Sequence, residues 1–157
     1  LVAAFAPCGA TLVSGGTTAG VAGLAGDVGA ALPGIHTIGY VPATVPPGVT
    51  VDRDPRRYRE VRATSGDDFS AFESLQAWTD VAASRLAVTD VRVLGINGGS
   101  IAAAEYRVAL ALGARVGIVA GSGREADRLL ADPEWSAAPT LVALRPDAAE
   151  LGRFLRG

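Results

Sequence analysis

Short runs of Val, Ile and Leu alternate along the chain with longer stretches that have helical spacing. The short runs have the length and composition of strands buried on both faces, and Gly or Pro bounds most of them. We expect strands over residues 10–14, 36–40, 91–95, 115–120 and 139–144. The stretches between them predict helices over residues 17–32, 70–86, 101–112, 124–131 and 147–155. Strands that alternate with helices predict an α/β fold with a parallel sheet covered on both faces.

Residues 43–69 carry neither pattern and are rich in Pro, Arg and Asp. A loop of this length is usually functional or mobile. Its charged residues form either a lid over a ligand or an ordinary solvated surface, and they are Arg56, Arg57, Arg59, Asp67 and Asp68. Ser70 ends the loop, and Glu73 follows at the capping-box spacing, so we expect Ser70 to cap the next helix.

Size and charge limit the functional classes. The chain has 157 residues, of which 49% are hydrophobic, which predicts one domain over residues 1–157. Its formal net charge of −2 gives no basic field for nucleic acid. All the basic residues are arginines, so a phosphate-binding lysine of the P-loop type and Schiff-base chemistry are both excluded.

The chain has a single cysteine and a single histidine, which limits the metal sites and catalytic groups that it can form. Cys8 is the only cysteine, so the chain can form no internal disulfide and no multi-cysteine metal site, and a cytoplasmic location fits best. His36 has no partner at a recognisable spacing and is expected on the surface or at a strand edge. We expect no metal and no cofactor. No apolar run reaches the length of roughly 18 residues that a membrane span needs.

Three glycine-rich turns follow predicted strands, at residues 14–20, 95–100 and 121–124. In a parallel sheet these turns meet at the carboxyl edge, where backbone N–H groups and helix N-termini favour a phosphate. The alternative is that they are tight connections that bind nothing. The candidate ligand-binding residues are Gly15, Gly16, Thr17, Thr18, Asn97, Gly98, Gly99, Ser100, Glu105, Gly121, Ser122, Gly123 and Arg124.

Several of these residues have an ordinary structural alternative. Thr17 and Thr18 stand where hydroxyl groups cap helices. Asn97 either contacts a base or ribose or satisfies its own turn. Glu105 either accepts hydrogen bonds from ribose hydroxyls or pairs with an arginine on a solvated face. Arg124 opposes the dipole of its own helix, which suggests an anion, although acidic neighbours could compensate.

Three segments, residues 15–23, 38–42 and 97–105, resemble in their order the landmarks of the SLOG superfamily. That superfamily includes the Lonely-Guy phosphoribohydrolases and the cytosolic N-terminal domains of TRPM channels, and residues 121–130 resemble the TRPM-type branch. The resemblance implies a Rossmann-like three-layer sandwich that binds nucleotides or nucleotide-derived signals such as ADP-ribose or NAD. It also places residues 1–9 in the first helix, with the first strand before Leu1.

The second turn departs from the phosphoribohydrolase pattern Pro-Gly-Gly-x-Gly-Thr-x-x-Glu. Gly98, Gly99 and Glu105 match it, whereas Asn97 replaces the proline and Ile101 and Ala102 replace the Gly-Thr pair. These changes remove a hydroxyl and a close backbone approach. They favour binding over hydrolysis, and Glu105 is the catalytic candidate only if the protein is an enzyme.

Three functions remain open at the sequence level. The first is a sensor that binds a nucleotide-derived small molecule and relays its occupancy to an effector domain or membrane protein. The second is a nucleotide N-glycosidase of the Lonely-Guy type, and the third is an assembly domain with empty turns. The resemblance also allows a homodimer, since dimers are common in the superfamily.

Overall fold

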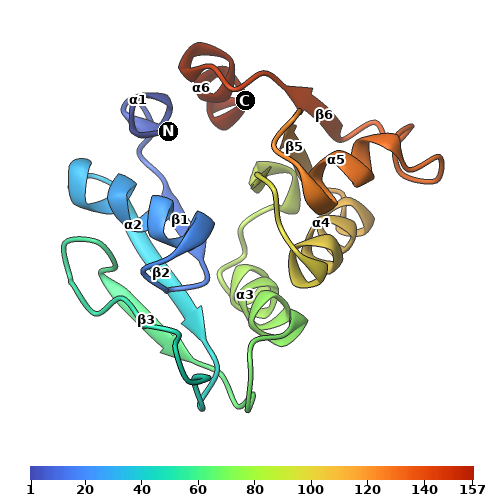
Figure 1. Cartoon of the computed structure of the whole chain (residues 1–157). Helices are drawn as coiled ribbons and strands as arrows, with labels where there is room; N and C mark the ends of the chain where they lie inside the picture. The colour runs from blue at the N-terminus through green and yellow to red at the C-terminus, as the bar shows by residue number, and fades with distance from the viewer. The chain divides into compact units, whose positions relative to one another are not determined.

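The computed structural model describes residues 1–157, and the chain divides into two compact units, residues 1–78 and 79–157 (Figure 1). In the first unit lie α1 (Val2–Phe5), β1 (Thr11–Ser14), α2 (Gly20–Ala31), β2 (His36–Val41), β3 (Glu60–Ala63) and the start of α3 (Ala71–Ala83). After α3 come a 3₁₀ turn (Val88–Asp90), β4 (Arg92–Gly95), α4 (Ser100–Leu112), β5 (Arg115–Val119), α5 (Arg124–Ala131), β6 (Leu141–Leu144) and α6 (Ala148–Arg156). None of the helices is long and apolar enough to cross a membrane.

Each unit contains one parallel sheet of three strands. The order is β1-β2-β3 in the first unit and β4-β5-β6 in the second, so neighbours in the sequence are neighbours in space. Parallel pairing needs a long crossover, and α2, α4 and α5 provide three of the four. The α/β class and its parallel, Rossmann-like organisation are therefore confirmed.

The predicted strands all form, but the prediction that residues 43–69 are one long loop is wrong. Glu60–Ala63 is a strand, β3, which pairs with β2 at the edge of the first sheet. Its sequence contains two charged residues and no apolar run, so no strand pattern shows in it. Sheet pairing with a well-defined neighbour decides its conformation instead.

The capping box at the start of α3 forms as predicted. The Ser70 hydroxyl accepts a hydrogen bond from the N–H of Phe72 at 3.1 Å, and the Glu73 carboxylate accepts one from the N–H of Ser70 at 2.8 Å. Glu73 is buried and also accepts a 2.6 Å hydrogen bond from the Thr64 hydroxyl. This carboxylate therefore ties the end of β3 to the first turn of α3.

Arg57 holds the segment after β2 against α2. Its guanidinium donates to the buried carboxylate of Asp52 at 2.6 Å and to the Gly23 carbonyl at 2.9 Å, and it pairs with Asp27. A Cβ on Gly26 would lie 2.9 Å from a terminal nitrogen of Arg57. The glycines of α2 therefore make room for this arginine.

Gly29 gives a test of this packing. A Cβ on Gly29 would lie 2.3 Å from the Arg57 carbonyl oxygen and 2.8 Å from a Thr37 methyl carbon. Alanine favours a helix by roughly 1 kcal/mol over glycine, but forcing apart a packed backbone costs more. We expect Gly29→Ala to lower the free energy of unfolding by about 2 kcal/mol. The matched Gly34→Ala, where nothing lies within 4 Å, should unfold like the wild type in urea.

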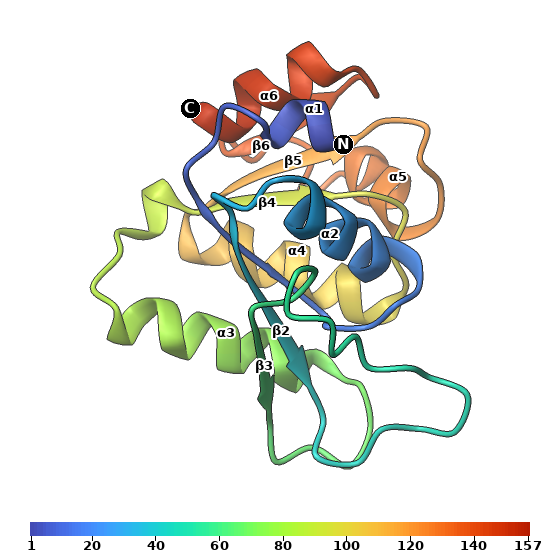
Figure 2. The same cartoon turned by 90° about the vertical axis from the view of Figure 1, so that its left-hand side faces the viewer.

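The second unit has two helical layers around its sheet. Figure 2 shows α4 on one side of β4, β5 and β6 and α6 on the other. The buried side chains of Val116 and Ile118 alternate with Gly117, whose face is occupied by the ring of Phe154 from α6. On the opposite face, Tyr106 from α4 covers Gly95 at the end of β4. The turns after β4 and β5 thus leave a sheet that has a helix packed on each face.

Candidate functional site

The start of α4 has no side-chain cap. Its N-cap residue is Gly99, and the N–H groups of Ser100, Ile101 and Ala102 have no acceptor in the protein. By contrast, α6 is capped by the Asp147 carboxylate, which accepts from two backbone N–H groups. An uncapped helix start carries a partial positive charge, and its orphan donors can bind an anion.

The turn after β5 is tied to the turn after β4 by hydrogen bonds. The Asn97 N–H donates to the Ser122 hydroxyl, and the Ala126 N–H donates to the Asn97 carbonyl, each at 2.9 Å. Two of the three glycine turns predicted to share an edge therefore lie side by side within the second unit.

Asp127 occupies the N–H groups of the third turn. Its carboxylate accepts hydrogen bonds from the Gly121 N–H at 2.8 Å and from the Gly123 N–H at 2.9 Å. Both groups were candidates for phosphate contact, and here the protein itself satisfies them. The contribution of the third turn is therefore to place the Ser122 hydroxyl and the Arg124 side chain next to the second turn.

Arg124 is the most distinctive residue of this region. Its backbone has a φ of +50°, in the left-handed region that side chains disfavour, and Asn97 has a φ of +58°. The Arg124 side chain is exposed and makes no ion pair or hydrogen bond. A Cβ on Gly99 would lie 3.2 Å from one of its terminal nitrogens. The guanidinium therefore lies against the N-cap of α4.

The positively charged guanidinium of Arg124 and the positive end of the α4 dipole thus lie next to each other, and Arg124 has no ion-pair partner. The helix start contributes roughly half a positive charge and the guanidinium a full one. Such an arrangement repels itself in the absence of an anion and is stabilised by one. Backbone N–H groups and a planar guanidinium together suit the oxygens of a phosphate or carboxylate.

Glu105 lies on α4, five residues after Ser100. It is half-buried, no group in the protein donates a hydrogen bond to it, and burial raises the pKa of its carboxyl. The neighbouring Tyr106 is buried, and burial together with the charge of Glu105 raises the pKa of its phenol to about 12. Glu105 therefore has free acceptor oxygens, as a group that contacts ligand hydroxyls requires.

The raised pKa of Glu105 gives a prediction about stability. The folded chain keeps a proton on this carboxyl at pH values where the unfolded chain has lost it, so stability falls as pH rises from about 4.5 through the raised pKa. Glu105→Gln removes this loss, and we expect it to raise the free energy of unfolding at pH 7 by about 1 kcal/mol. Thermal melts from pH 4 to 8 measure this, and the gain should disappear at pH 4. A less stable variant at every pH would mean that the carboxylate has a structural role.

The glycines of the second turn differ in what they tolerate. Gly98 has a φ of +86°, and a Cβ there would lie 2.6 Å from that of Ala102. Gly99 has an ordinary φ of −106° and would meet only the flexible end of Arg124. Gly98 is therefore needed for the turn itself, and Gly99 for the approach of Arg124.

The first turn lies in the first unit and is partly covered. The Thr18 N–H donates to the Thr50 carbonyl at 3.0 Å, and Thr17 forms an antiparallel bridge with Val51. The expectation that Thr17 and Thr18 start the helix and cap it is therefore wrong: Thr17 is held in the bridge, Thr18 lies in a bend, and no side chain caps the helix. The helix begins at Gly20 after an uncapped Ala19.

Gly16 needs its conformation for a close backbone crossing. It has a φ of +63°, and a Cβ on Gly39 of β2 would lie 2.5 Å from its Cα. Gly15 has more space, with only Ala22 within 4 Å. The N–H groups of Gly20, Val21 and Ala22 have no acceptor in the protein, so this turn keeps donors of the kind found at α4.

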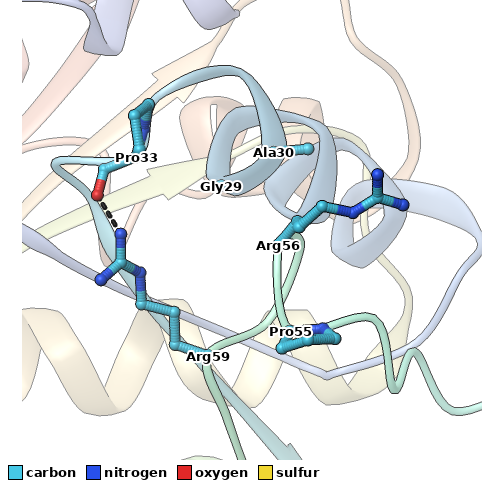
Figure 3. Close-up of a pocket in the computed structure, with 6 residues that line it drawn as sticks. All are labelled: Gly29, Ala30, Pro33, Pro55, Arg56 and Arg59. Atoms are coloured by element: carbon cyan, nitrogen blue, oxygen red, sulfur yellow. Dashed lines mark hydrogen bonds between the residues drawn. The ribbon is translucent and has the colours of Figure 1, made fainter.

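The arginines of the predicted lid are fixed to their surroundings, whereas Asp67 and Asp68 are exposed, and only Asp68 is bonded, to the N–H of Phe69. Arg56 pairs with Asp54 at 2.7 Å, and Arg59 donates to the Pro33 carbonyl. Figure 3 shows both arginines at a pocket of about 390 Å³, with Arg59 directed to Pro33 and Arg56 pointing away from it. Sequence reasoning missed this pocket, which joins the end of α2 to residues 55–59. Arg56 is neutralised by Asp54, whereas Arg59 donates to a carbonyl and keeps its positive charge.

The remaining candidates form no site. His36 is exposed at the start of β2 and lies 3.7 Å from Glu60. Cys8 is half-buried, with its thiol 3.9 Å from the Ala4 carbonyl. No group of three or more His, Cys, Asp and Glu side chains could hold a metal ion.

Comparison with models of known protein families gives no match for this chain, and comparison with curated proteins gives none either.

Proposed function

We propose that the protein is a ligand-sensing domain that binds a nucleotide or a nucleotide-derived signal, such as ADP-ribose or NAD, and relays its occupancy to a partner or effector. The ligand's phosphate binds at the start of α4, between the free N–H groups of residues 100–102 and the Arg124 guanidinium. The resemblance to the SLOG superfamily supports the choice of a nucleotide over other anions.

One observation carries this proposal. An exposed, unpaired arginine with a left-handed backbone lies against the uncapped start of α4. Both the backbone conformation and the meeting of like charges cost stability in the free protein. A bound phosphate would offset that cost, which is why we assign the region to binding and not to folding.

Glu105 supports a ligand that carries hydroxyl groups as well as phosphate. Its carboxylate has no donor in the protein, and ribose hydroxyls are donors. Asn97, at the end of β4, adds an exposed amide that can accept or donate at the same turn. A ribose phosphate therefore matches both the positive turn and the acceptor further along α4.

The alternative is a nucleotide phosphoribohydrolase, in which Glu105 would act at the ribose. The free carboxylate favours it, since a carboxyl with a raised pKa can exchange a proton. Ile101 and Ala102 oppose it, because the hydroxyl and the glycine of the phosphoribohydrolase pattern are missing.

Calorimetric titration with ADP-ribose, NAD and AMP, followed by chromatography after overnight incubation, separates these functions. A sensor shows saturable binding with the ligand recovered intact. A hydrolase releases free base and ribose phosphate, and Glu105→Gln would then abolish release while Arg107→Gln would not. Absence of binding for all three ligands would overturn both.

A further inference from the structure

A second positive region lies at the opposite edge of the β4-β5-β6 sheet. Arg92 and Arg115 are the first residues of β4 and β5, and they are direct partners in the parallel register. Partners in register point to the same face of a sheet, and like charges placed side by side there are destabilising. The register thus sets two guanidinium groups next to one another at the amino edge.

Arg92 and Arg115 point to the face of the sheet that α6 covers. Gly117 and Val119 follow Arg115 on this face, and Gly117 lies under Phe154 of α6. A Cβ on Gly157, just after α6, would lie 3.0 Å from a terminal nitrogen of Arg92. The end of α6 therefore reaches the same edge as the two arginines.

Between α6 and the strands lies a pocket of about 260 Å³. Its apolar wall consists of Val142, Leu144 and Phe154, and its polar rim of Arg115, Arg153, Glu150 and Gly157. Arg115 and Arg153 are both exposed, and neither makes an ion pair or hydrogen bond. The pocket thus combines an apolar floor with two guanidinium groups that no side chain binds, although the charge of Arg153 also acts on the nearby carboxylate of Asp147.

The one carboxylate on the rim is already used. Glu150 accepts hydrogen bonds from the Arg145 N–H at 2.9 Å and from Arg145 Nε at 2.6 Å. The carbonyl end of α6 supplies roughly half a negative charge. Asp147, which acts on Arg153 and also lies 3.8 Å from Arg145, adds at most one more against the three positive charges of Arg92, Arg115 and Arg153. The amino edge of this sheet therefore keeps an excess of positive charge.

Arg92 adds an independent observation. Its Nη1 donates to the Thr89 carbonyl at 2.6 Å, whereas its Nε is buried with no acceptor in the protein. Buried donors are satisfied in nearly all proteins, and an unsatisfied one calls for an explanation such as an ion or water. Arg92 is the register partner of Arg115, and Arg115 lines the pocket.

We infer that this pocket is a second anion site, held by Arg115 and Arg153 with Arg92 next to Arg115, and that it takes a small phosphomonoester. Guanidinium groups pair with phosphate oxygens in a planar, two-point geometry. The volume of about 260 Å³ fits a small ligand, and the Phe154 wall accepts its apolar part. This site is independent of the proposed function, because it lies under α6, on the face of the sheet opposite α4, with its arginines toward the amino edge, whereas the α4 turn lies at the carboxyl edge.

Titration of the ¹⁵N-labelled chain with sodium phosphate, against sodium chloride of equal ionic strength, tests the site by NMR. We expect saturable shifts of the amides of Arg115, Gly117 and Arg153. Arg115→Gln should raise the dissociation constant at these amides about tenfold. Arg156→Gln, which removes the same charge from α6 outside the pocket, should change it less than twofold.

The amides report the two anion sites separately. Shifts confined to residues 98–102 and 123–124 would place phosphate only at the α4 turn and overturn this second site. Unsaturated shifts, or equal affinities in the wild type and Arg115→Gln, would also overturn it. Shifts at residues 98–102 report on the α4 turn and not on this pocket, so failure of the second site leaves the proposed function standing.

Discussion

Arg124→Gln is expected to weaken the binding of ADP-ribose by about 10- to 100-fold, because the variant loses the only cation placed at the start of α4. The side chain makes no hydrogen bond or ion pair in the free protein, so its removal breaks neither. Calorimetry on the wild type and variant measures the change. The stability of the variant should not fall.

The control lies one turn along α5. Arg128 is also exposed and pairs with Glu125, so Arg128→Gln removes the same charge away from the turn. We expect less than a threefold change in affinity there. Equal losses in the two variants would mean that long-range charge alone attracts the ligand, and an unchanged affinity in Arg124→Gln would remove the arginine from the site.

Arg124→Gly separates binding from folding further. Glycine adopts a φ of +50° without the strain that arginine carries there. The glycine variant should therefore be at least as stable as the wild type and should still lose affinity. A variant that is more stable but binds more weakly would show that Arg124 serves binding and not folding.

Arg57→Ala is expected to lower the free energy of unfolding by about 3 kcal/mol, because it leaves the carboxylate of Asp52 buried without its partner. Asp52 is 3% exposed, and its second oxygen accepts only a 3.2 Å hydrogen bond from the Asp54 N–H. The variant also loses the hydrogen bond to Gly23. Urea denaturation followed by circular dichroism measures the loss.

Arg56→Ala is the matched control at the adjacent position. Its side chain is 82% exposed, and its ion pair with Asp54 lies at the surface. Exposed pairs contribute little to stability, although this one holds the pKa of Asp54 at about 2 through the hydrogen bonds that Arg56 donates. If Arg56→Ala and Arg57→Ala unfold at the same urea concentration, the buried network is not what fixes residues 50–58.

The strands and helices with apolar runs could be predicted because burial dictates their composition. Helix α5 runs over residues 124–131 as expected, and the capping box at Ser70 forms because two residues at fixed spacing satisfy each other's backbone. Strand β3 could not be predicted, since its polar sequence adopts an extended conformation only beside β2.

The candidate site was predictable in part. The uncapped start of α4 follows from Gly98, Gly99 and the absence of a capping side chain. The role of Asp127 was not visible, because its hydrogen bonds to Gly121 and Gly123 depend on a turn conformation that no pattern encodes. The Arg57 network was missed for a similar reason, since its partners Asp27 and Asp52 lie far apart in sequence.

The central claim is that the free N–H groups at the start of α4 hold the phosphate of a nucleotide-derived ligand. The most direct test is an amide NMR titration of the chain with ADP-ribose. The account predicts saturable shifts of Ser100, Ile101 and Ala102, together with Arg124, and their loss in Arg124→Gln. Binding that leaves these four amides unmoved, or no binding at millimolar ligand, would contradict it.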